Sequence, residues 1–99
     1  MGYRRVFFGK FLGDRDLDAE IKYFKETVVP IMAARGATSA EIVQTEDDLF
    51  LATAIYPDET TADANPEEIQ ALRKGIIEAF NLNAMDAYGG TSVVGISIK

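Results

Sequence analysis

The four tyrosines are the side chains of this sequence best suited to chemistry on a bound molecule. Each combines a flat apolar ring that can stack with a hydroxyl that can hydrogen-bond. Tyr3, Tyr23, Tyr56 and Tyr88 could therefore orient a phenolic ligand. In a chain of 99 residues, tyrosines also serve at the edge of a core or at a dimer seam. Both interpretations are open at this point.

Polar side chains on otherwise apolar segments form a second group of candidates. A cleft could use Arg5, Thr53, Arg73 and Ser97. Arg73 could equally extend its apolar stem along the protein and keep its charge in water. Asp86 lies two positions before Tyr88 and is a candidate base. No residue is predicted to be catalytic. The predicted ligand-binding residues are Tyr23, Phe24, Thr53, Tyr56, Arg73, Asp86 and Tyr88.

Metal and thiol chemistry find little support in the sequence. The chain has no His and no Cys, so a thiolate site, a disulfide framework and haem ligation by histidine are not expected. Residues 14–18 (DRDLD) have the spacing of a calcium loop, but Ala19 and Lys25 occupy the positions where an EF-hand needs Gly and Glu. These acids are better explained as helix-capping residues, and we predict neither a metal site nor a cofactor.

Charge and hydropathy restrict the partners and the location. A net charge of −6 and a pI near 4.5 argue against nucleic acid, which is bound by a surplus of Lys and Arg on one face. The longest wholly apolar stretch, residues 28–34, is far too short to span a bilayer. The N-terminal region lacks the uninterrupted apolar stretch of a secretory signal, because Lys10 breaks it. We therefore expect a cytoplasmic protein with no membrane or nucleic-acid partner.

The first half of the chain predicts a strand followed by a helix. Residues 3–12 are rich in aromatic and β-branched side chains on both alternating faces, which indicates a strand covered on both sides. Asp16 is the expected helix cap and Gly36 the expected end. Pro30 lies inside the helix and predicts a kink or break near residues 25–29. The apolar stripe of this helix is Leu17, Ile21, Phe24, Val28 and Ile31.

The second half predicts a hairpin, another helix and a last strand. Residues 38–45 and 49–56 read as paired strands joined at residues 46–48, and residues 57–64 as a polar connection. Asn65 and Pro66 mark the start of a helix. We expect a loop over residues 81–92 and a strand over residues 91–98. Within that loop, Gly89 and Gly90 could bind an anion through backbone N–H groups, but a turn requiring positive φ is the preferred interpretation.

The order β-α-β-β-α-β predicts one ferredoxin-like α+β domain over residues 1–99. Such a domain has a four-stranded antiparallel sheet with two helices on one face. The apolar residues on the other face would then be open to water. The simplest way to cover them is a second copy packed sheet to sheet, so we expect a homodimer.

Two segments resemble the dimeric α+β barrel superfamily, which includes the antibiotic-biosynthesis-monooxygenase-like proteins. They are residues 24–36 (FKETVVPIMAARG), a helix with a proline shortly before its terminal glycine, and residues 54–58 (AIYPD), a strand end. The resemblance implies a cleft between helices and sheet, in which some members oxidise aromatic substrates without metal or flavin. Other members bind haem through a histidine, which this chain lacks. It also lacks the pocket tryptophan of some cofactor-free members, so no catalytic residue is carried over.

Three hypotheses for function follow. The first is a homodimer that binds a small apolar or aromatic ligand in a cleft between sheet and helices. The second is a cofactor-independent monooxygenase or isomerase acting on an aromatic, polyketide-like substrate. The third is a structural interaction domain without a ligand.

Overall fold

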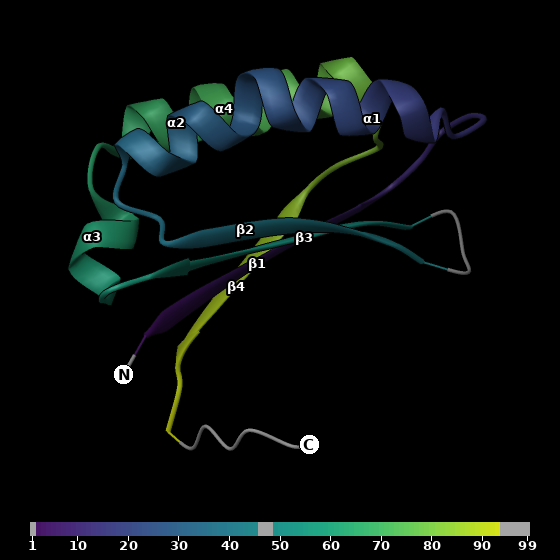
Figure 1. Cartoon of the computed structure of the whole chain (residues 1–99). Coiled ribbons are helices and arrows are strands. Elements are labelled where there is room, and N and C mark those ends of the chain that lie inside the picture. The colour runs from purple at the N-terminus through teal and green to yellow at the C-terminus, as the bar shows by residue number, and fades with distance from the viewer. Residues whose placement is uncertain (1, 46–48, 94–99) are drawn as a thin grey trace.

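The computed structural model describes residues 2–45 and 49–93. Two layers are visible in Figure 1, a sheet and a pair of long helical segments that lie across one of its faces. The residues joining the two central hairpin strands, 46–48, lie outside the described part of the chain. In chain order the elements are β1 (Tyr3–Lys10), α1 (Leu17–Tyr23), the π-helical turn η1 (Phe24–Val28), α2 (Val29–Ala34), β2 (Ser39–Gln44), β3 (Leu49–Tyr56), α3 (Glu59–Asp63), α4 (Pro66–Phe80) and β4 (Asp86–Thr91).

The sheet has the order β2-β3-β1-β4 and every neighbouring pair is antiparallel. Phe7 in β1 is opposite Ala52 in β3 on one side and Ala87 in β4 on the other. Because directly opposed residues share a face, these three side chains all lie on the face toward the helices. The expected α+β, ferredoxin-like arrangement is confirmed.

The last strand begins earlier than the sequence predicts. Residues 86–91, expected to be a loop, form β4, in which Tyr88 is opposite Val6 and Gly89 is opposite Arg5. The loop prediction was wrong because glycine has low strand propensity, whereas tertiary pairing decides here. Of the predicted strand over residues 91–98, Thr91 ends β4, residues 92 and 93 are not in a strand, and residues 94–98 lie outside the described part of the chain.

The predicted positive-φ turn at Gly89 and Gly90 is also wrong. Among the described glycines only Gly36 has a positive φ, 97°. Gly89 is needed for a different reason, since a Cβ atom there would lie 2.0 Å from the hydroxyl of Tyr3. The glycine thus lets a tyrosine ring pass over the edge strand.

The first helical segment departs from regular α-helix where the sequence predicts a kink or break. Pro30 has no N–H to donate back to the preceding turn, and the helix widens into η1 just before it. Val29 N–H donates to the carbonyl of Phe24, five residues back, as in a π-helix. Asp16 caps the start as predicted, because its side chain accepts from Ala19 N–H at 3.1 Å. Gly36 ends the segment.

The predicted apolar stripe is right only in part: Phe24 and Val28 are buried, Leu17 and Ile31 are partly buried, and Ile21 is exposed. Ile21 is 37% exposed, whereas the neighbouring Glu20 is 1% exposed. Glu20 is buried because Arg15 binds it through two hydrogen bonds of 2.8 and 2.9 Å. The Arg15 guanidinium also lies 5.1 Å from the ring centre of Phe11. An ion pair that forms across five residues therefore overrides the hydropathy pattern.

The predicted polar connection contains a short helix, α3. Asp58 caps it, since the Asp58 carboxylate accepts from Thr61 N–H at 2.7 Å. That hydrogen bond, helped by the Thr61 side chain, lowers the pKa of Asp58 below its ordinary value of 3.8. α4 begins at Pro66 as predicted, but Asn65 makes no side-chain cap; it has φ 54° and its carbonyl accepts from Glu68 N–H at 3.0 Å.

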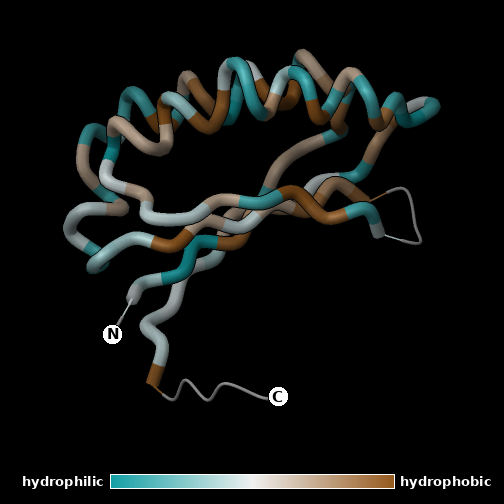
Figure 2. The backbone as a smooth tube through the Cα atoms, in the orientation of Figure 1, coloured by the Kyte–Doolittle hydropathy of each residue, from teal (hydrophilic) through white to brown (hydrophobic). Residues whose placement is uncertain are grey.

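Apolar residues concentrate where the two layers meet (Figure 2). At one end of this interface aromatic rings fill the space. The Phe50 and Phe80 ring centres are 5.3 Å apart, Phe11 contacts Phe50 edge-on at 6.3 Å, and Tyr23 contacts Phe80 edge-on at 5.3 Å. We call these four residues, together with Leu82, the packed end.

Candidate functional site

The other end of the same interface is hollow. A cavity of about 340 Å³ lies between the inner face of the sheet and the two helical segments above it. Its walls are mainly apolar, and Phe50 stands between it and the packed end. A volume above roughly 300 Å³ with mostly apolar walls is typical of small-molecule sites.

The floor of the cavity is formed by strand residues that alternate toward the helices. Ala52 and Tyr56 come from β3, Phe7 from β1 and Ala87 from β4. Two of the four are alanines, the smallest side chains that a strand can present to a core. The hollow therefore results from small residues in the sheet beneath the helices.

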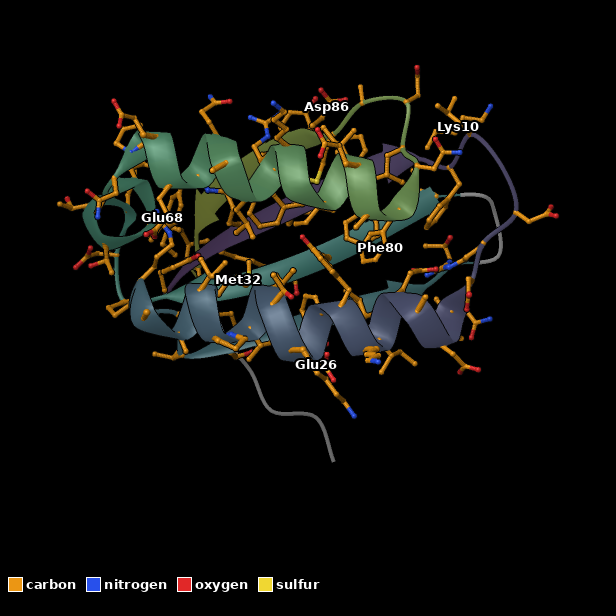
Figure 3. All side chains as sticks on the ribbon, turned by 90° about the horizontal axis from the view of Figure 1, so that it is seen from above. Lys10, Glu26, Met32, Glu68, Phe80 and Asp86 are labelled. Atoms are coloured by element: carbon orange, nitrogen blue, oxygen red, sulfur yellow. The ribbon has the colours of Figure 1, made fainter. Side chains whose placement is uncertain are left out.

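The roof is formed by the two helical segments. Phe24, Val28 and Met32 recur every fourth residue through η1 and α2, which places them on one face. Leu72 and Ile76 face them from α4. Seen from above in Figure 3, Met32 and Phe80 project between the two helical segments, Met32 over the hollow end and Phe80 over the packed end.

The mouth of the cavity is held by two ion pairs. Arg5 on β1 pairs with Asp63 at the end of α3, and both line the cavity. Arg35, whose side chain is 5% exposed, donates to the carbonyl of Ala62 at 2.9 Å and to Glu68 at 3.0 Å. These contacts attach α3 to both layers.

Arg73 brings an unneutralised positive charge to the wall. One of its guanidinium nitrogens donates to the carbonyl of Met85, and no carboxylate among residues 2–45 and 49–93 pairs with it. Two uncharged polar groups also reach the cavity, Tyr56 and Gln70, and neither side chain has a hydrogen-bond partner in the described part of the chain. An apolar cavity that contains the unneutralised charge of Arg73, a hydroxyl and an amide suits a flat ligand that carries an acidic hydroxyl or another anionic group.

Three of the seven predicted ligand-binding residues meet at this cavity: Phe24, Tyr56 and Arg73. Tyr23 does not line it, because its ring packs edge-on against Phe80 at the packed end.

The other three predicted residues lie on the outer face of the sheet, away from the helices. The Thr53 hydroxyl donates a hydrogen bond to the Glu41 carboxylate at 3.1 Å, and Asp86 in β4 is paired opposite Phe8 in β1. Tyr88 is 63% exposed and stacks on Phe8 with ring centres 5.5 Å apart. The cavity therefore involves Phe24 and Tyr56 but not Tyr88.

Several lining residues were not predicted as site residues. Arg5 is among the polar groups that the sequence offers to a cleft, but it is not among the predicted ligand-binding residues. Because it shares the alternation of Tyr3 and Phe7, it must face the helices. Asp63 and Arg35 gave no signal, since their positions depend on α3, which the sequence presents as a polar connection. Gln70 and Met32 are ordinary residues of amphipathic helices and gave no signal either.

The outer face of the sheet is apolar at its centre. No described helix covers it, as Figure 1 shows. Its apolar side chains include Val6, Phe8, Val43, Leu51 and Ile55, which are partly buried, and the exposed Tyr88.

None of the described helices is long and apolar enough to cross a membrane. The cytoplasmic location expected from the sequence stays a prediction. Within the described residues, no group of three or more carboxylates is placed to hold a metal ion.

Comparison with solved structures shows which proteins share the fold. A monooxygenase of Streptomyces coelicolor in complex with the ligand nanaomycin D superposes with a TM-score of 0.74 at 16% identity, over 99% of this chain and 93% of that one. A dimeric ferredoxin-like protein from an uncultured marine organism gives 0.64 at 14% identity, over 96% and 98%. A proposed antibiotic biosynthesis monooxygenase of Deinococcus radiodurans gives 0.60 at 14% identity, over 100% and 99%.

These similarities define a class of protein by its fold. The chain shares the ferredoxin-like α+β fold of these structures, and the fold implied by the resemblance is confirmed. By sequence, the chain matches no protein-family model and no curated protein.

Proposed function

We propose that this protein binds a small, flat, mainly apolar molecule with one acidic or anionic group in the cavity between the sheet and the helices. The observation that carries the proposal is the cavity of about 340 Å³ with the unneutralised Arg73 on its wall. A charge left without a carboxylate beside apolar walls costs solvation, which an anionic ligand would restore. Tyr56 and Gln70 supply free polar groups that can fix the orientation of the ligand.

A fluorescence titration tests this proposal. N-phenyl-1-naphthylamine is a neutral aromatic probe whose emission rises in an apolar site. We expect saturable binding to the wild-type protein and its loss in Ala52→Leu, which puts a larger side chain on the cavity floor. Leu12→Ala, at a side chain that is 62% exposed, is the matched control and should bind as wild type does. Equal binding by wild type and Ala52→Leu contradicts the site.

A cofactor-independent monooxygenase is a second candidate. Arg73 and Tyr56 on an apolar wall could stabilise a substrate carbanion or phenolate, and one of the structural neighbours is a monooxygenase with a bound ligand. In the balanced reaction, an activated CH₂ group and O₂ give a C=O group and water, so the substrate supplies all the electrons. Oxygen uptake with a panel of anthrones and hydroxyquinones tests it. Uptake in wild type that falls in Arg73→Met supports the oxygenase, and binding without uptake leaves a binding protein.

We propose further that residues 1–99 form one domain that pairs with a second copy through the outer sheet face. The partly buried apolar side chains there support this, as do the dimeric ferredoxin-like neighbours. Light scattering should give twice the chain mass of 10.9 kDa for wild type and the chain mass for Phe8→Asp. A monomeric wild-type protein at micromolar concentration argues against the pairing.

A further inference from the structure

The Arg5 side chain is held in place on β1, the strand beneath the mouth of the cavity. Its side chain is 20% exposed and its guanidinium lies 5.1 Å from the ring centre of Tyr3. Tyr3 is held in turn by its passage over Gly89, where a side chain would collide with its hydroxyl. The residues opposite Arg5 are Ala54 and Gly89, which leave the guanidinium room to reach the cavity. Arg5 is therefore a positioned cation.

The partner of Arg5 is held much less firmly. Asp63 is the last residue of the five-residue helix α3, and its side chain is 52% exposed. Half-exposed ion pairs of this kind stabilise a protein by about 1 kcal/mol or less, because water solvates the separated charges well. The carboxylate can therefore leave Arg5 at little cost.

The second arginine at the mouth behaves differently. Arg35 is 5% exposed and reaches three protein oxygens, on Ala62, Asn65 and Glu68. Two of these are backbone carbonyls, which cannot be displaced without moving the chain. Within residues 2–45 and 49–93, Arg5 donates to one acceptor, the exposed carboxylate of Asp63. Of the two carboxylates that form ion pairs at the mouth, only that of Asp63 can be replaced by a ligand without moving the backbone.

We propose that Arg5 is a second anchor for ligands, masked by Asp63, and that an anionic group on the ligand replaces the Asp63 carboxylate. The exchange replaces one charge-assisted hydrogen bond by another, so its free-energy change is close to zero for a ligand carboxylate or sulfonate. Asp63 thus lowers the affinity for anions through competition and repulsion, and it leaves the affinity for neutral ligands unchanged. This inference rests on the proposed function, since both need a ligand in the cavity.

Two probes of nearly the same shape separate charge from fit. The anionic probe is 1-anilinonaphthalene-8-sulfonate, and N-phenyl-1-naphthylamine is the same ring system without the sulfonate. Asp63→Asn should tighten binding of the sulfonate about two- to fivefold, the equivalent of an exposed ion pair, and should leave the neutral probe unchanged. Arg5→Gln should weaken binding of the sulfonate probe and leave binding of the neutral probe unchanged. Arg5→Lys, which keeps the charge, is the second variant should Arg5→Gln fail to fold, and it should retain a preference for the sulfonate.

Glu68→Gln is the matched control, because Glu68 is the half-exposed carboxylate of the other ion pair and does not line the cavity. It should change neither affinity. If Asp63→Asn tightens both probes equally, α3 has merely loosened and the masking role is overturned. An unchanged sulfonate affinity in Asp63→Asn overturns it as well. Failure of the neutral probe to bind wild type is a different outcome, which removes the proposed function and this inference with it.

Discussion

The two ends of the interface between sheet and helices differ in how they use the same architecture. At the packed end, Phe11, Phe50 and Phe80 interlock with ring centres 5.3 to 6.3 Å apart. At the hollow end, Ala52 and Ala87 lie beneath the helices, and about 340 Å³ is empty. The elements and the pairing continue through both ends. Side-chain size alone therefore decides where the interface is a core and where it is a site.

The difference has an energetic meaning. Close-packed rings gain dispersion and hydrophobic free energy, whereas the lining of an empty space loses those contacts. A chain of 99 residues has little stability to spare. Keeping a hollow of this size is consistent with a role for it. Opening the packed end should therefore cost stability, whereas filling the hollow end should cost binding.

The largest expected effect comes from opening the packed end. Phe80→Ala removes the ring that contacts both Tyr23 and Phe50, and should lower the free energy of unfolding by about 3–5 kcal/mol. Urea denaturation followed by circular dichroism measures this. The control is Leu12→Ala, an exposed apolar side chain, which should change stability by less than about 0.5 kcal/mol. A Phe80→Ala protein as stable as wild type would mean that this end is not the core.

Filling the hollow end should weaken ligand binding and leave stability nearly unchanged. Ala52→Leu adds three carbon atoms above a floor that has room for them, so unfolding free energy should change by less than about 1 kcal/mol. Binding of N-phenyl-1-naphthylamine should weaken at least about tenfold, or 1.4 kcal/mol, because the added atoms occupy the same space. Destabilisation as large as that of Phe80→Ala would show that the space is already filled.

Removing the positive charge of Arg73 from the cavity wall should lower the affinity for anionic ligands selectively. Arg73→Met removes the unneutralised charge but keeps an apolar stem of similar length, so the sulfonate probe should lose about 1 kcal/mol or more of affinity and the neutral probe little. Lys74→Met is the matched control, since the adjacent Lys74 is exposed and does not line the cavity. Equal losses in both variants would point to net charge rather than to the site.

The smallest effect concerns α3 at the hollow end and depends on pH. The folded pKa of Asp58 lies below 3.8, so its stabilising contribution is complete above that value and is lost as the pH falls through the folded pKa. We expect faster amide exchange of Thr61 N–H, relative to the packed end, below about pH 3.8. In Asp58→Asn the cap has no proton to gain, so this local pH dependence should disappear.

The sequence predicted the layers well and the site only in part, and particular residues explain why. Pro30 acts locally, so the irregular helical turn before it could be foreseen. Gly89 and Gly90 suggest a turn, but their pairing with β1 is a long-range interaction that no local pattern reveals. Tyr88 was therefore assigned to the cleft, although the alternation of β4 puts it on the outer face.

The hollow itself could not be predicted. An alanine such as Ala52 reads as an ordinary core residue until the helix above it is known. The burial of Glu20 shows the same limit, because it depends on Arg15 and on the ring of Phe11 rather than on helical spacing.

One measurement tests the contrast between the two ends most directly. Methyl NMR spectra of protein labelled at Met and Leu can be recorded as N-phenyl-1-naphthylamine is added. Met32 and Met85 line the cavity, whereas Leu82 is buried at the packed end. Ring currents from the bound probe should shift Met32 and Met85 in a saturable way and leave Leu82 nearly unchanged. Saturable shifts at Leu82 with Met32 and Met85 unmoved would contradict a ligand site at the hollow end.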